Sequence, residues 1–132
     1  MKTNLIALIL AAATLSGCAI FDNRPPEQVV ADRAQERFDL LMQGEFEKAY
    51  RYATPGYRAT NTVDQYAADF GGVSMWLEAE VGEVNCPLLE EVLVCDVVTL
   101  ISYNAPRMGY VQTTQVPERW IKVENSWYLV VK

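Results

Sequence analysis

The stretch Val92–Tyr103, with the sequence VLVCDVVTLISY, decides the fold. Its residues are almost all apolar, many are β-branched, and Asp96 is its one charged residue. Such a run favours a strand that is covered on both faces for part of its length. We therefore expect a central strand here, with the neighbouring segments pairing on either side of it.

Further strand patterns lie on both sides of this stretch. We expect them at residues 77–82, at 110–116 with a continuation at 120–123, and at 127–131. In the first of them, Leu77, Ala79 and Val81 alternate with polar residues or glycine, which predicts one apolar face. Pro117 has no N–H to donate, so it indicates either a bulge or a sheet edge. Asn125 predicts a tight turn before the last strand.

Three helices are expected ahead of the strands. The first opens at Pro25-Pro26, and its apolar face consists of Val30, Ala34, Phe38, Leu41 and Met42. Its other side is filled by the charged residues Asp32, Arg33, Glu36 and Arg37. The second helix covers 45–52 and ends at the break 54–56. The third starts at the capping box 62–65 and ends at Gly71-Gly72. This predicts an α+β fold in which three N-terminal helices pack on one face of a curved antiparallel sheet of about four strands.

The composition excludes several classes of function. The chain has 11 basic and 17 acidic residues, a net charge of −6, which disfavours nucleic acid as a partner. It has no histidine, which excludes Ser-His-Asp and Cys-His catalysis and the zinc sites that need histidine. The sequence suggests no cofactor.

The first of the three cysteines follows a short apolar run. Residues 15–18, Leu-Ser-Gly-Cys, come after Met1-Lys2 and the run 5–13, an order that resembles the signal peptide and lipobox of a bacterial lipoprotein. The resemblance implies that 1–17 is removed and that a lipid on Cys18 holds the protein at the membrane. In a Gram-negative cell it implies the outer membrane, facing the periplasm. The alternative is a non-lipidated signal peptide that is cleaved near Ala19. On this interpretation 18–25 is a tether and 26–132 is one domain.

The other two cysteines are expected to form a disulfide, because an even pair in an oxidising compartment pairs readily. If a two-residue turn centres on Glu90-Glu91, Cys86 falls directly opposite Cys95, with Cα atoms about 4.5 Å apart. Pro87 would then face Val94 at a hydrogen-bonded position without an N–H to give. A wider loop with the cysteines at its base is the alternative, and it also keeps the sulfurs close.

Three segments resemble the nuclear transport factor two-like superfamily. They are 44–50 (GEFEKAY), 54–58 (TPGYR) and 120–130 (WIKVENSWYLV). The resemblance covers 26–132 and implies a cone in which a curved sheet wraps a long helix. Relatives with this fold include isomerases and dehydratases, whose sites use an aspartate base, a tyrosine donor and often a histidine at the mouth of the cone.

The candidate pocket residues are Phe38, Tyr66, Trp76, Asp96, Tyr103 and Trp120. A buried Asp96 would have a raised pKa and act as a base. The alternative is that it faces solvent or pairs with an arginine. Glu78 and Glu80, with Glu83, are candidate ligands of a hard cation, but alternating glutamates are more often a solubilised edge, so no metal is expected.

Two functional hypotheses follow. The first is a membrane-anchored envelope lipoprotein whose domain binds an envelope protein or a small apolar ligand without catalysis. The second is a small isomerase, dehydratase or hydrolase that uses an Asp-Tyr pair in the cone. The missing histidine favours the first hypothesis. One observation distinguishes the two hypotheses. The enzyme hypothesis requires a cavity in which an aspartate and a tyrosine hydroxyl point at the same empty position.

Overall fold

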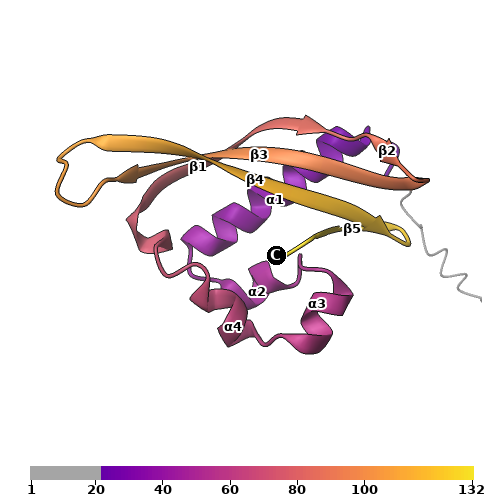
Figure 1. Cartoon of the computed structure of the whole chain (residues 1–132), viewed down its shortest axis with the longest axis horizontal. Coiled ribbons are helices and arrows are strands. Elements are labelled where there is room, and N and C mark those ends of the chain that lie inside the picture. Colours follow the sequence, from indigo (N-terminus) through magenta and orange to yellow (C-terminus); the bar gives the residue numbers. More distant parts are fainter. Residues whose placement is uncertain (1–21) are drawn as a thin grey trace, which may run out of the picture.

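Five strands form one antiparallel sheet, in the computed structural model that describes residues 22–132 (Figure 1). The strands are β1 (Trp76–Asn85), β2 (Leu88–Leu89), β3 (Val92–Asn104), β4 (Val111–Val123) and β5 (Ser126–Leu129). Their order is β1-β3-β4-β5, and β2 pairs with the start of β3. The apolar stretch from Val92 onward is therefore the central strand, as its composition predicts.

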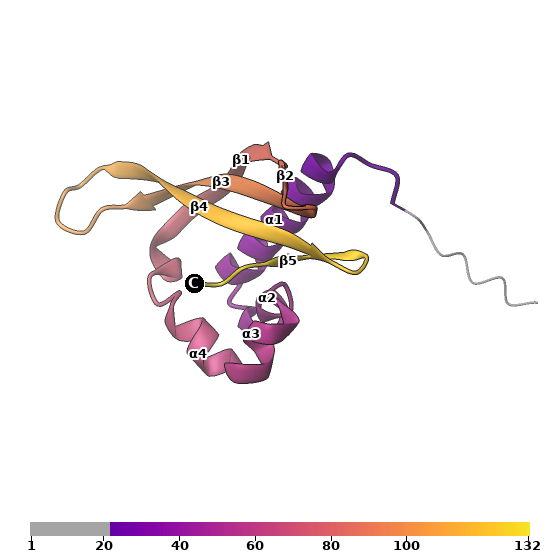
Figure 2. The same ribbon diagram turned by 45° about the vertical axis from the view of Figure 1, so that its right-hand side comes forward.

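The helices all lie on one face of this sheet (Figures 1 and 2). They are α1 (Pro26–Met42), α2 (Phe46–Tyr50), α3 (Pro55–Thr60), α4 (Val63–Ala68) and the short 3₁₀ helix η1 (Val73–Met75). The long helix α1 crosses the sheet, and α2 to α4 gather beyond its C-terminal end. The capping box at Thr62 and Gln65 forms as predicted.

The expected layout of three helices on about four strands is wrong. The structure has α3 where the sequence suggested only a break, because Pro55 occupies the first turn and the Thr54 hydroxyl caps the N–H of Tyr57. It also has β2, a strand of two residues that is too short to give a periodic signal.

Two bulges bend β1. Trp76 and Glu78 pair with the adjacent residues Tyr103 and Ser102, so Leu77 is an extra residue on the β1 side. Leu77 is consequently 50% exposed, although its alternation with Ala79 placed it on the apolar face. The second bulge lies between Val81 and Val84. Bulges of this kind increase the local twist and give the sheet its curvature.

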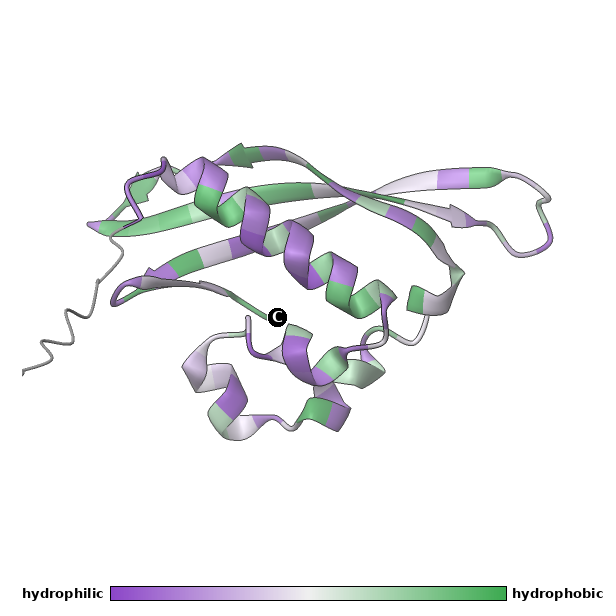
Figure 3. Cartoon of the chain, turned by 180° about the vertical axis from the view of Figure 1, so that it is seen from behind, coloured by the Kyte–Doolittle hydropathy of each residue, from purple (hydrophilic) through white to green (hydrophobic). Residues whose placement is uncertain are grey.

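The core lies between α1 and the inner face of the sheet. One cluster includes Val30, Ala34, Tyr52, Cys95, Val97, Trp120, Trp127 and Leu129. The other includes Phe38, Leu41, Ala49, Tyr66, Ala79 and Ile101. Seen from behind, β3 is coloured mostly as hydrophobic along the part that α1 covers (Figure 3). Both clusters receive residues from α1 and β3, so these two elements organise the core.

The disulfide between Cys86 and Cys95 is present, with an S–S distance of 2.01 Å and a Cα–Cα distance of 4.0 Å. The predicted register is confirmed: Leu88 pairs with Leu93 and the turn consists of two residues, Glu90 and Glu91. Pro87 is accommodated because its carbonyl accepts the N–H of Val94 at 3.4 Å. The reciprocal bond to the Val94 carbonyl cannot form, because proline has no N–H.

Candidate functional site

A buried ion pair lies between α1 and the sheet. Arg37 Nη1 donates to Glu118 Oε1 at 2.5 Å, and the two side chains are 2% and 8% exposed. Burial raises the pKa of the Glu118 carboxyl above its ordinary value, and the positive charge of Arg37 opposes that effect. Charges this deep in a domain are stable only when they are paired and hydrogen-bonded.

Two residues named as pocket candidates complete this polar network. Arg37 Nε donates to the Tyr66 hydroxyl at 2.9 Å, and Trp120 Nε1 donates to Glu118 Oε2 at 3.3 Å. The Arg37 guanidinium also lies 5.3 Å from the centre of the Phe70 ring. Burial raises the pKa of the Tyr66 hydroxyl, so it remains neutral at physiological pH. No side-chain nitrogen or oxygen of this network is buried without a hydrogen-bond partner.

The sequence interpretation missed both charged members of this network. It assigned Arg37 to the polar side of α1, but Arg37 follows Val30 by seven residues and precedes Leu41 by four, which places it on the apolar face. Glu118 precedes Trp120 by two residues on β4, so the two share a face. These spacings could have predicted that Arg37 and Glu118 both face the core.

The remaining pocket candidates form no hydrogen bond with the network, although the Arg37 guanidinium lies 5.1 Å from the centre of the Phe38 ring. Phe38 and Trp76 pack together, with ring centres 6.1 Å apart. The Tyr103 hydroxyl donates to Gln112 at 3.0 Å near the end of β3. Asp96 is on the outer face, where Arg119 Nε donates to it at 2.7 Å and lowers the pKa of its carboxyl. Asp96 is therefore paired with an arginine and is not a buried base.

An apolar cavity of about 510 Å³, open to the surface of the protein, lies where the end of α1 meets α2, α4 and η1. It is lined by Leu41, Met42, Gln43, Gly44, Phe46, Ala67, Phe70, Gly71, Val73 and Ser74. None of these side chains titrates in the physiological range, so the cavity offers shape and apolar contact but no general acid or base.

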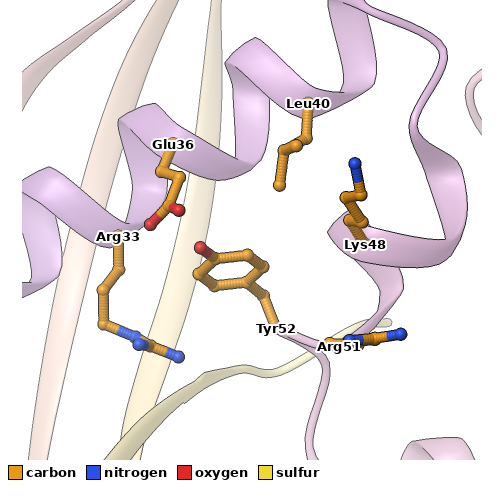
Figure 4. A pocket seen from close by; sticks show the side chains of 6 residues that line it. All are labelled: Arg33, Glu36, Leu40, Lys48, Arg51 and Tyr52. Atoms are coloured by element: carbon orange, nitrogen blue, oxygen red, sulfur yellow. The ribbon is translucent and has the colours of Figure 1, made fainter.

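A smaller cavity of about 280 Å³ lies between α1 and α2. It is lined by Arg33, Glu36, Leu40, Lys48, Arg51 and Tyr52 (Figure 4). The Tyr52 hydroxyl is directed at the Glu36 carboxylate, and Arg33 lies over the Tyr52 ring at 4.8 Å. Burial, together with Glu36, raises the pKa of Tyr52 to about 12. Tyr52 is therefore a hydrogen-bond donor and not a base at neutral pH.

None of the six candidate pocket residues lines either cavity. Within residues 22–132 no three His, Cys, Asp or Glu side chains are grouped closely enough to hold a metal ion. Glu78 and Glu80 are exposed on β1. No helix in this part of the chain is long and apolar enough to span a bilayer.

Comparisons with known proteins show a similarity of fold to solved structures but no match to a family. No family model matches the chain, and no curated protein matches it. The fold is similar to the solution structure of RPA3114, a SEC-C motif containing protein from Rhodopseudomonas palustris, with a TM-score of 0.55 and 15% identity. The match covers 75% of this chain and 73% of that one. At this identity the similarity concerns the fold alone.

This similarity corrects the expected family. The matching structure is described as a SEC-C motif protein and not as a nuclear transport factor two-like domain, so that resemblance is not supported. The comparisons give no evidence of a lipobox or signal peptide either, so the resemblance to bacterial lipoproteins is not carried forward. Cys18 and the segment 1–17 lie outside the described residues.

Proposed function

We propose that this domain is a binding module that takes an apolar ligand in the cavity between α1, α2, α4 and η1, without catalysing a reaction. The observation that carries the proposal is the chemistry of the lining: a cavity of about 510 Å³ formed by mostly apolar residues and by no charged side chain. This volume is in the range of about 300–1,000 Å³ that small-molecule sites occupy. The lining has no titratable acid or base, and the chain has no histidine that could activate the one hydroxyl of the lining, Ser74, so the cavity supports binding only.

The buried network supports the same proposal. Arg37 and Glu118 are the groups that would be most reactive in the core, and each is held by the other and by an aromatic partner. Their side chains face one another beneath the sheet and do not line the cavity. The polar chemistry of the interior therefore serves the fold, and the apolar cavity is left for a ligand.

Titration of the protein with the fluorescent apolar probe 1-anilinonaphthalene-8-sulfonate tests the proposal. Ala67→Leu places extra volume inside the cavity and should weaken probe binding by about tenfold or more. Ala68→Leu is the matched control, because Ala68 is the next residue on α4, is exposed and does not line the cavity. Equal affinities for the probe in the two variants would contradict the assignment.

The alternative function, a small enzyme, has one observation in its favour. Glu36 and Tyr52 bring a carboxylate and a phenol together at a cavity, which is the kind of pair such an enzyme needs (Figure 4). The two groups point at each other and not at a shared empty position, which favours a structural role. Turnover of an ester or enol substrate that Glu36→Gln and Tyr52→Phe both abolish would replace the binding proposal with this one.

We also propose a location at the cell envelope. The support is the Cys86–Cys95 disulfide, because such bonds persist in oxidising compartments and are rare in the cytosol. Protein isolated from cells under alkylating, non-reducing conditions should fractionate with the envelope and carry no alkylated Cys86 or Cys95. Two free thiols at these positions would contradict the proposed location.

A further inference from the structure

The first half of β4 has no strand on its outer side. β5 pairs with β4 between Trp120 and Val123, and the N–H of Val130 donates to the Arg119 carbonyl at 2.8 Å. Ahead of Arg119, β4 pairs with β3 on one side and, among residues 22–132, with no strand on the other. We call residues 111–117 on that side the free edge of β4.

The pairing pattern identifies the backbone groups at this edge. The Arg119 carbonyl faces β5, and successive residues of a strand direct their N–H and C=O to opposite sides. Val111, Thr113 and Gln115 therefore direct both groups toward the free edge. Residues 111, 113 and 115 can therefore both donate and accept hydrogen bonds with a neighbouring strand. Pro117 belongs to the same row, but it can only accept, because it has no N–H.

The other open side of the sheet, at β1, is covered at its middle by one side chain. On β1, Gln35 Nε2 donates to the Ala79 carbonyl at 2.8 Å, and Gln35 Oε1 accepts the N–H of Val81 at 2.9 Å. One amide thus pairs with the backbone of β1 as a neighbouring strand would. Natural proteins usually protect exposed edges in such ways. The edge at 111–115 has no cover and no charged residue, which indicates that it is used for pairing.

The charge distribution favours a second copy of the chain as the partner. The protein has a net charge of −6, whereas residues 97–117 contain one charged residue, Arg107. Two negatively charged copies repel each other electrostatically over most of their surfaces, and this repulsion is weakest along residues 97–117. The same hairpin exposes apolar side chains, with Met108 58%, Tyr110 56% and Val111 55% accessible. It extends past the helices, which leaves the edge open to another molecule (Figure 2).

We propose that two copies of this chain pair antiparallel through the free edge of β4 and form one continuous sheet. A two-fold axis at Thr113 places Thr113 opposite its counterpart and Val111 opposite Gln115 of the second copy. Threonine pairs across antiparallel strands are favourable, and no like charges meet in this register. The interface is separate from the apolar cavity, so this proposal does not depend on the ligand.

The mass of the full chain in solution, measured by light scattering, tests the pairing. The unaltered chain should give about twice 14.9 kDa. Thr113→Lys places two like charges opposite each other at the axis and should halve that mass, while circular dichroism remains unchanged. Thr60→Lys is the matched control, because Thr60 is exposed at the end of α3, and its mass should stay doubled. A monomeric unaltered chain, or a Thr113→Lys variant that remains a dimer, would overturn the proposal.

Cross-linking tests the register. In a chain in which Cys18 is replaced by serine, Thr113→Cys should form a covalent dimer on mild oxidation, because paired Cα atoms at such a position lie about 5.5 Å apart. Thr60→Cys in the same background should not. A folded Thr113→Cys variant that stays uncross-linked would contradict this register.

Discussion

The pair Arg37 and Glu118 provides the strongest test of how this core is held together. Removing either partner leaves a buried charge without compensation, which typically costs about 3–5 kcal/mol. We expect this for Arg37→Met and for Glu118→Gln, because both side chains are almost inaccessible to water. An unfolding entropy of about 2.1 cal/mol/K per residue over residues 22–132 converts this loss to a decrease in Tm of about 13–21 °C.

The assay is a double-mutant cycle measured by chemical denaturation at constant pH. Because the second substitution removes a charge that the first has already left unpaired, the double variant should be more stable than the sum of the single effects predicts, by at least about 1 kcal/mol. The matched control is Asp96→Asn with Arg119→Met, an exposed pair on the same sheet whose coupling should be below about 1 kcal/mol. Additivity of the Arg37 and Glu118 effects within about 0.5 kcal/mol would refute this reasoning.

Three further predictions follow from the described contacts. Reduction of the disulfide should lower the Tm by about 10 °C without unfolding the domain at room temperature, as followed by calorimetry; an unchanged Tm would show that the bond adds nothing. The pKa of Asp96, followed by NMR, should lie below 3.8 and return toward it in Arg119→Met, so the small stabilisation is present above pH 3.8 and is lost as the pH falls through the folded pKa. Tyr52 should ionise near pH 12 in an ultraviolet titration, so its contribution to stability is complete below pH 10 and is lost as the pH rises through 12. Glu36→Gln should lower that value only part of the way, because burial is the larger cause, and ionisation of Tyr52 near pH 10 in the unaltered protein would contradict the buried hydroxyl.

Local patterns accounted for features that depend on residues close in the chain. The apolar composition of Val92–Tyr103 predicted the central strand, and Thr62 with Gln65 predicted the cap of α4. The hairpin register and the disulfide followed from counting residues on both sides of Glu90-Glu91. Pro117 lies at the free edge of an unbroken β4, so the edge interpretation is correct and the bulge is not found there. Each of these depends on propensity, capping or spacing over a short distance.

The sequence alone determined the position of the central strand, the strand turns and the pairing of Cys86 with Cys95. The tertiary structure decided the rest. The burial of Arg37 depends on Glu118, which is 81 residues away, and its charge suggested a solvent-facing position until that partner was known. Leu77 does not lie on the apolar face, because β1 has a bulge where it pairs with β3. The alternation of residues along β1 does not reveal that bulge. The apolar cavity and the free edge of β4 also depend on contacts between distant segments. The cavity is formed by residues from several helices, and the edge is free because no other described strand pairs with that part of β4.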